Sequence, residues 1–190
     1  MLEPTYPLRT ERLDLRPYRP GDLDDLRETH AVEEVMRYLY SDVLSEDELR
    51  ETLTKKMSRT AVRSEGDGLN PVAVLRETGE VVGDATLVWL SETHRTGEVG
   101  FVLKPAFQGR GLATEMAREM LRVGFEEMRL HRIIGRCDAR NTASAAVLAR
   151  LGMRREAHLL QNEWVKGEWT DELSYAMLAD EWAALQARRG

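Results

Sequence analysis

Residues 108–113, with the sequence QGRGLA, combine residue types that suit the binding of a phosphate group. They follow a strand-like segment at 98–103 and precede residues 112–128, in which apolar side chains recur at helical spacing. Gly109 and Gly111 let the backbone turn tightly and approach a ligand, and the first turn of the helix offers unpaired N–H groups at the positive end of its dipole. The sequence thus predicts a diphosphate site that needs no lysine, with a strand-to-helix turn that holds no ligand as the alternative.

The other residue types argue against metal, thiol and nucleic-acid chemistry. The four histidines are widely spaced and no CxxC pair accompanies them, so we expect no metal site. The single cysteine, Cys137, lies in the apolar run 132–138 and is interpreted as a buried reduced thiol rather than a nucleophile. With 27 basic and 33 acidic residues, the formal charge of −6 argues against a nucleic-acid partner and suits a cationic acceptor.

The start of the chain lacks the charged-then-apolar pattern of a signal peptide, and there is no run of 18 apolar residues. We therefore expect a cytoplasmic protein without a membrane partner. A length of 190 residues with 42% apolar residues suits one α/β domain, residues 1–190, with a core that needs no disulfide or metal.

Strands and helices must alternate along the chain to position the phosphate loop. A first strand is expected at 12–18, a helix capped by Asp22, and a second helix that begins at the capping-box pair Ser45 and Glu48. Turn residues then divide 71–103 into three antiparallel strands. Beyond the long helix, the pattern predicts a strand at 132–137, a helix at 144–151 closed by glycine, a hairpin of strands 154–165 and 168–178, and a helix at 180–188.

The connector 35–44 is richer in apolar and aromatic residues than an ordinary loop. Two interpretations fit it, core packing and the wall of a substrate groove. On the second interpretation, Met36, Tyr38 and Tyr40 contact the acceptor.

Two motifs, in this order, resemble the cofactor segments of the GNAT superfamily of acyl-coenzyme A dependent N-acyltransferases. In the first, Gln108, Gly111 and Ala113 match the pyrophosphate-loop pattern of the superfamily. In the second, residues 141–153, an Asn and a Ser precede a helix that ends in Leu-Gly-Met, with Met153 in place of the usual Phe.

The two ends of the chain extend the resemblance. The tail at 166–178 is similar to the end of the RimJ and RimL branch, which acetylates protein N-termini, including those of ribosomal proteins. The opening LRTERLDLRPY also fits that branch. The resemblance therefore covers nearly the whole chain.

The resemblance implies an α/β (α+β) fold, with a mixed, mostly antiparallel twisted sheet of about seven strands flanked by helices. It also implies that the strand ending at Leu103 splays from the strand that begins near Arg132, and that acetyl-CoA, the acyl donor, enters the gap. The cofactor-binding residues implied in this way are Phe101, Val102, Leu103, Gln108, Gly109, Arg110, Gly111, Leu112, Ala113, Thr114, Asn141 and Ser144.

Acyl transfer from a thioester to an amine needs a neutral amine, a stabilised oxyanion and a proton for the departing thiolate. Comparison with the RimL branch implies that Glu163 is the general base and that Ser144 protonates the sulfur. Glu98, which opens the strand beside the gap, is the second candidate base, and the sequence does not decide between the two glutamates. An ion pair is the alternative for each glutamate, and helix capping is the alternative for Ser144 and Asn141.

The expected function is therefore transfer of an acetyl group from acetyl-CoA to a primary amine, in the first place a protein or peptide N-terminal α-amine. A free α-amine has an ordinary pKa near 8 and a lysine one near 10.4, so an N-terminus is the easier acceptor at pH 7. The alternatives are a small amine such as an aminoglycoside or a polyamine, and, from another class, an acyl-CoA-binding sensor without turnover. Monomer and homodimer both stay open.

Overall fold

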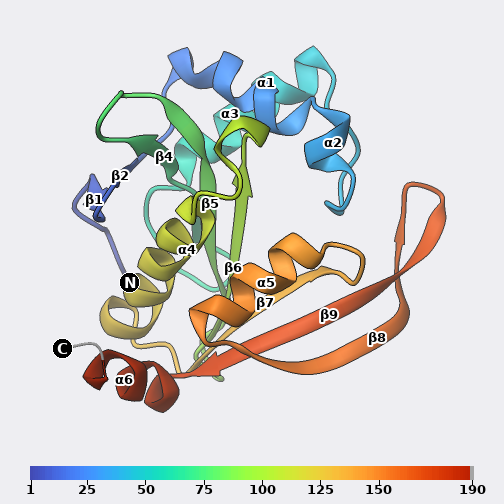
Figure 1. The fold of residues 1–190 in the computed structure, drawn as a ribbon. Helices are drawn as coiled ribbons and strands as arrows, with labels where there is room; N and C mark the ends of the chain where they lie inside the picture. The colour runs from blue at the N-terminus through green and yellow to red at the C-terminus, as the bar shows by residue number, and fades with distance from the viewer. Residues whose placement is uncertain (189–190) are drawn as a thin grey trace.

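The computed structural model of the protein describes residues 1–188, which are organised around one mostly antiparallel sheet of nine strands (Figure 1). The strands are β1 (Leu8–Arg9), β2 (Leu13–Arg16), β3 (Gly68–Leu69), β4 (Val72–Leu75), β5 (Val81–Ser91), β6 (Thr96–Leu103), β7 (Arg132–Asp138), β8 (Arg154–Val165) and β9 (Glu168–Leu178). The helices are α1 (Leu23–His30), α2 (Glu33–Met36), α3 (Glu46–Ser58), α4 (Leu112–Arg122), α5 (Thr142–Leu151) and α6 (Ala179–Ala187). Short 3-10 turns occupy Pro20–Asp22 and Pro105–Phe107, and α4 continues into a π-helical turn at Val123–Glu127.

The strand order is β1-β2-β4-β5-β6-β7-β9-β8, and β3 pairs with β5. The three-strand meander at 71–103 and the hairpin of β8 and β9 are confirmed, because alternation and turn residues marked both clearly. The expected number of about seven strands was too low. The additional strands β1 and β3 have two residues each, which is too short for alternation to show.

The N-terminal region departs from the sequence prediction in one local feature. Asp22 occupies the N-cap position of α1, as predicted, but its side chain makes no capping hydrogen bond. Its carboxylate instead accepts two hydrogen bonds from the Arg16 guanidinium, both at 2.8 Å, and one from the backbone N–H of Arg19 at 2.7 Å. Ser45 and Glu48, in contrast, form the predicted capping box at the start of α3.

Helices cover both faces of the sheet (Figure 1). Helices α4 and α5 pack on the face that carries Ala85 and Val99, in the larger hydrophobic core. Helices α1 and α3 pack on the opposite face, where Leu26 and Leu53 meet Val72. Within residues 1–188, no helix is long and apolar enough to cross a membrane.

The sheet opens between its two parallel strands. Strands β6 and β7 pair only at Thr96 with Arg132, Gly97 with Ile133 and Glu98 with Ile134, although β6 runs on to Leu103 and β7 to Asp138. Beyond the third pair, each strand has an edge without a strand partner on this side. The predicted splay between these strands is confirmed.

Candidate active site

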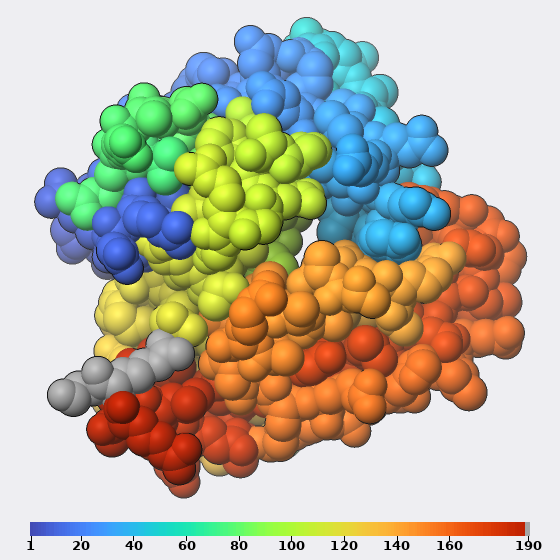
Figure 2. All heavy atoms as spheres, in the orientation of Figure 1, coloured from blue at the N-terminus to red at the C-terminus, as the bar shows by residue number. Residues whose placement is uncertain are grey.

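A cavity of about 800 Å³ lies where the parallel strands part. Figure 2 shows the surface hollowed between the blue α2 segment, the yellow-green residues before α4 and the orange α5. The residues that line it are Glu34, Val35, Arg37, Tyr38, Leu39, Phe101, Val102, Leu103, Gln108, Gly109, Gly111, Ala113, Thr114, Asn141, Ala143, Ser144, Ala146, Val147 and Arg150. Its volume falls within the range of about 300–1,000 Å³ that is common for small-molecule sites.

Ten of the twelve predicted cofactor residues line this cavity, and Arg110 and Leu112 do not. The Arg110 guanidinium instead lies over the Phe107 ring, 5.4 Å from its centroid. The Leu112 side chain is fully buried in the core, so only its backbone can face a ligand.

Sequence reasoning missed two sets of lining residues. The first comes from α5 and consists of Ala143, Ala146, Val147 and Arg150. Their spacing of three or four residues places them on one helix face, so the assignment of Ser144 to the site could have led to them. The second comes from α2 and the residues after it and consists of Glu34, Val35, Arg37 and Leu39. The apolar composition of the connector 35–44 indicated a possible wall there, but of the lining residues it led only to Tyr38.

The start of α4 is built to leave backbone donors free. Gly109 and Gly111 have φ angles of +72° and +78°, a region that side-chain-bearing residues rarely adopt. Gly111 is the N-cap of α4 and offers no side-chain acceptor, whereas Ser45 and Asn141 cap α3 and α5 with their side chains. Within residues 1–188, the backbone N–H groups at 109–114 donate to no acceptor. Such an array, at the positive end of a helix, suits an anion.

The start of α5 has two functions in the structure. The Asn141 side-chain oxygen accepts a hydrogen bond from the Ser144 N–H at 3.0 Å, so Asn141 is a helix cap, as the alternative reading had it. Both residues also line the cavity. The Ser144 hydroxyl has no hydrogen-bond partner among the described residues, so it is free to meet a ligand atom.

Arg136, in the middle of β7, brings three carboxylates together beside the gap. Its Nε and Nη2 donate to the two Glu98 oxygens at 3.0 and 3.3 Å. Its Nη1 lies 3.4 Å from Glu172 Oε2 and 3.8 Å from Glu163 Oε1. Both candidate bases therefore belong to one cluster, although neither lines the cavity itself. Three carboxylates around one guanidinium leave an excess of negative charge.

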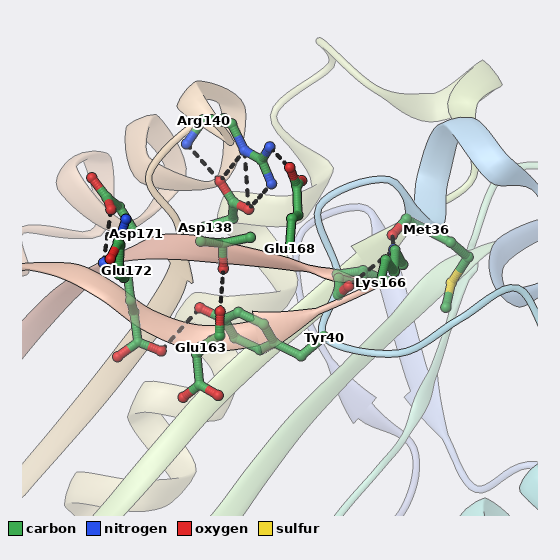
Figure 3. Close-up of polar contacts among 12 residues, drawn as sticks. Met36, Tyr40, Asp138, Arg140, Glu163, Lys166, Glu168, Asp171 and Glu172 are labelled. Carbon is green, nitrogen blue, oxygen red and sulfur yellow. Dashed lines mark hydrogen bonds and ion pairs between the residues drawn. The ribbon is translucent and has the colours of Figure 1, made fainter.

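Glu172 is the member of the cluster that the sequence did not indicate. It is 2% exposed, and its Oε2 also accepts a hydrogen bond from the Tyr40 hydroxyl at 2.9 Å (Figure 3). Burial and this bond to a carboxylate raise the pKa of Tyr40, so the hydroxyl stays protonated and keeps donating. The sequence signal that could have led to Glu172 was Arg136, because a charged side chain inside an apolar strand needs a carboxylate partner.

Residues of the segment between α2 and α3 and at its start lie partly in the protein interior and partly at the wall of the cavity. Met36 is fully buried and does not line the cavity, Tyr38 lines it, and the Tyr40 hydroxyl reaches Glu172. The hairpin turn between β8 and β9 holds this connector, because Lys166 Nζ donates to the backbone oxygens of Met36 and Leu39 (Figure 3). Core packing thus describes Met36, whereas contact of Tyr38 and Tyr40 with an acceptor stays a prediction.

Cys137 is buried, and burial raises the pKa of its thiol to about 11. A thiol with this pKa is protonated at neutral pH and is a weak nucleophile. Among the described residues, no group of three or more His, Cys, Asp or Glu side chains is arranged to hold a metal ion.

These features define a class of protein. The open edge of β6 can pair with an extended, amide-bearing chain, and the N–H groups before α4 can hold a diphosphate at the end of that chain. Carboxylates beside the gap can bind and deprotonate an amine. The fold and site suit a transferase that binds a diphosphate-bearing donor through an extended arm and passes a group to an amine.

Comparison with known families makes the class specific. The family model described as "Acetyltransferase (GNAT) domain" matches residues 12–154, and the chain belongs to this family. The GNAT family uses acetyl-CoA, whose diphosphate and pantetheine arm suit the free N–H groups before α4 and the open edge of β6. The protein is an acetyl-CoA-dependent N-acetyltransferase.

The similar proteins include an uncharacterized N-acetyltransferase, YnaD, of Bacillus subtilis, which is 33% identical over 92% of this chain and 98% of its own. A crystal structure of a GNAT-family acetyltransferase from Bacillus anthracis superposes with a TM-score of 0.81 at 32% identity, covering 91% of this chain and 98% of that one. Spermidine N(1)-acetyltransferase of Escherichia coli is 25% identical over 87% of each chain.

Proposed function

We propose that the protein, as a member of the RimJ and RimL branch, acetylates the N-terminal α-amine of a protein or peptide of the ribosomal-protein type. The observation that carries this proposal is the cluster of Glu98, Glu163 and Glu172 around the single cation of Arg136. Its excess negative charge attracts an ammonium group, and its carboxylates offer acceptors for the proton that the amine must lose. An α-amine, with an ordinary pKa near 8, gives up this proton more readily than a lysine or a polyamine.

The donor is held by the cavity-lining residues of β6, the loop before α4, and α5. Backbone groups at 101–103 pair with the pantetheine arm, and the N–H groups at 109–114 bind the diphosphate. Asn141 and Ser144 face the sulfur end. A backbone N–H near Val102 or Leu103 is the proposed donor to the oxyanion.

Glu163 is the proposed general base. Glu98 is fixed by two hydrogen bonds from Arg136, whereas Glu163 lies 3.8 Å from Arg136 and its side chain is 36% exposed. Glu163 therefore keeps lone pairs free to accept the amine proton, directly or through one water, as the C–N bond forms. When the C–S bond breaks, the free Ser144 hydroxyl donates its proton to the sulfur and is reprotonated from solvent. Glu98 is the second candidate base.

A small amine is the second candidate acceptor. The similarity to spermidine N(1)-acetyltransferase supports it, and so does the excess negative charge, which suits a polycation. The two acceptors differ in what lies beside the amine, a peptide backbone in one case and a flexible chain of further ammonium groups in the other.

Release of free thiol from acetyl-CoA tests the proposal. The acceptors are a panel of peptides with free N-termini, the same peptides with blocked N-termini and one internal lysine, and spermidine. We expect turnover with free N-termini and little with blocked ones. Turnover with spermidine alone would establish the second candidate instead. CoA binding without thiol release from any acceptor would mean an acyl-CoA sensor.

A further inference from the structure

The turn between β1 and β2, with the sequence TERL at 10–13, contacts the loop before α4 although it lies about a hundred residues away in the chain. The Arg12 guanidinium donates through Nη1 to the Arg110 backbone oxygen at 3.0 Å and through Nε to Glu115 Oε2 at 2.7 Å. Glu115 Oε1 accepts from the Arg12 backbone N–H at 2.7 Å and from the Thr10 hydroxyl at 2.6 Å. Arg12 thus joins a carbonyl of the loop to a carboxylate of the helix.

Glu115 lies in the first turn of α4, at the end where the free N–H groups are. A carboxylate at this end stabilises the helix when no anion is bound, but it repels an anion that binds at the same end. Burial raises the pKa of Glu115, but the hydrogen bonds from Thr10 and Arg12 outweigh burial and hold the pKa below its usual range. Glu115 is therefore charged at neutral pH, and Arg12 supplies the cation that compensates it.

The bond to the Arg110 oxygen also orients the loop. In a planar trans peptide, the C=O of one residue and the N–H of the next point in opposite directions. Because Arg12 holds the Arg110 oxygen on its own side, the Gly111 N–H points away from Arg12. Gly111 lines the cavity, and its N–H has no acceptor within the described residues.

We propose that Arg12 is a positioning residue for cofactor binding, which orients the loop at 108–111 and neutralises Glu115 without lining the cavity. This inference rests on the proposed assignment of the loop to the diphosphate. It gives the TERL turn a role that its place in the sequence, far from the other cofactor segments, does not indicate.

Calorimetric titration with CoA tests the inference on Arg12→Gln, with Arg76→Gln as the matched control. Arg76 donates to the backbone oxygens of Thr10 and Glu11 in the same turn but contacts neither Arg110 nor Glu115. We expect Arg12→Gln to weaken CoA binding roughly tenfold and Arg76→Gln to leave it within about twofold.

A donor without the diphosphate separates positioning from general damage. We expect Arg12→Gln to raise the KM for acetyl-CoA with little change in kcat, and to leave kcat/KM for S-acetyl-pantetheine unchanged. An equal loss with both donors would overturn the inference, because it would show a structural role. Failure of the wild-type protein to bind CoA would instead overturn the proposed cofactor site.

Glu115→Gln gives a second test that does not depend on the folding of the Arg12 variant. Neutralisation predicts that Glu115→Gln, unlike Arg12→Gln, does not weaken CoA binding, since removing the carboxylate leaves an uncompensated cation beside the diphosphate. CoA should bind as tightly as to the wild type or more tightly, and the affinity should fall more steeply with added salt. Weaker binding by Glu115→Gln would contradict the electrostatic part of the inference.

Discussion

At the scale of single residues, the sharing of Arg136 decides what each carboxylate can do. Glu98 and Glu172 are committed to hydrogen bonds with Arg136, and Glu172 also to Tyr40. Glu163 is the carboxylate least constrained by the protein. The difference between two glutamates that look equivalent in sequence is thus one of hydrogen bonding.

We expect Glu163→Gln to lower kcat by about 10² to 10⁴, the usual contribution of a general base, and Glu98→Gln to lower it less than tenfold. The residual activity of Glu163→Gln should rise with pH, since deprotonation of the acceptor in solution then replaces the base. Initial rates at saturating acetyl-CoA between pH 6 and 9 give both results. The reverse order of the two variants would make Glu98 the base.

The Tyr40 hydroxyl should stabilise the fold through buried Glu172. In Tyr40→Phe, this carboxylate keeps only the long contact to Arg136, so the free energy of unfolding should fall by about 1–2 kcal/mol. Tyr38→Phe is the matched control, because the Tyr38 hydroxyl has no hydrogen bond within residues 1–188. Urea denaturation compares the two, and equal stability of both variants would contradict the role given to Tyr40.

At the scale of elements, the helices differ in whether a side chain satisfies the backbone N–H groups at their N-terminal ends. α3 and α5 begin at side-chain caps, which satisfy the backbone there. α4 begins at Gly111 in a left-handed conformation without such a cap. The backbone N–H groups at the start of α4 stay free because its N-cap residue has no side-chain acceptor. They lie at the cavity, where a ligand can accept hydrogen bonds from them.

Gly111→Ala and Gly79→Ala form a matched pair, because both glycines have a φ of +78° and neither new Cβ would clash. Each substitution should cost about 1–2 kcal/mol of stability, the penalty for a side chain in this conformation. Only Gly111→Ala should weaken CoA binding, since relaxing its φ turns the loop amides away from the cavity. Thermal melts and calorimetry distinguish these effects, and unchanged CoA affinity in Gly111→Ala would contradict the role of the loop.

At the scale of the whole molecule, polar groups buried between helices and sheet tie the stability of the fold to pH. Asp84, which is 2% exposed, accepts hydrogen bonds from Tyr18, Lys56 and Asn70. His30 is also buried on this side, with its Nδ1 2.8 Å from the Thr29 hydroxyl. Burial lowers the pKa of His30, and nearby Asp84 only partly offsets this.

Stability should therefore fall as the pH drops below about 6.5. In that range the unfolded chain binds a proton at His30 more readily than the folded protein does, so acid favours unfolding. One such group contributes at most about 1.4 kcal/mol per pH unit. Denaturation between pH 5 and 8 should show a smaller slope for His30→Gln than for the wild type, and no smaller slope for the exposed His94→Gln. Identical slopes for all three proteins would exclude His30 as the source.

Much of the fold was predictable because its signals are local. The β8 and β9 hairpin, the capping box at Ser45 and the loop at 108–113 each depend on residues close together in the chain. Asp22 shows the limit of such reasoning, because it occupies the N-cap position of α1 but its side chain makes no capping hydrogen bond. Asp is a good cap in isolation, but Arg16 and the Arg19 N–H compete for its carboxylate once the chain has folded.

The sequence by itself determined the kind of donor through the resemblance of two short segments, 108–113 and 141–153, to the cofactor motifs of a known family. Only the tertiary structure decided how the rest of the site is assembled. Glu98, Arg136, Glu163 and Glu172 come from four strands, and Arg12 reaches the loop before α4 from the far end of the chain. Ion pairs between distant segments depend on strand register and on burial, and neither is encoded in the spacing of residues along the chain.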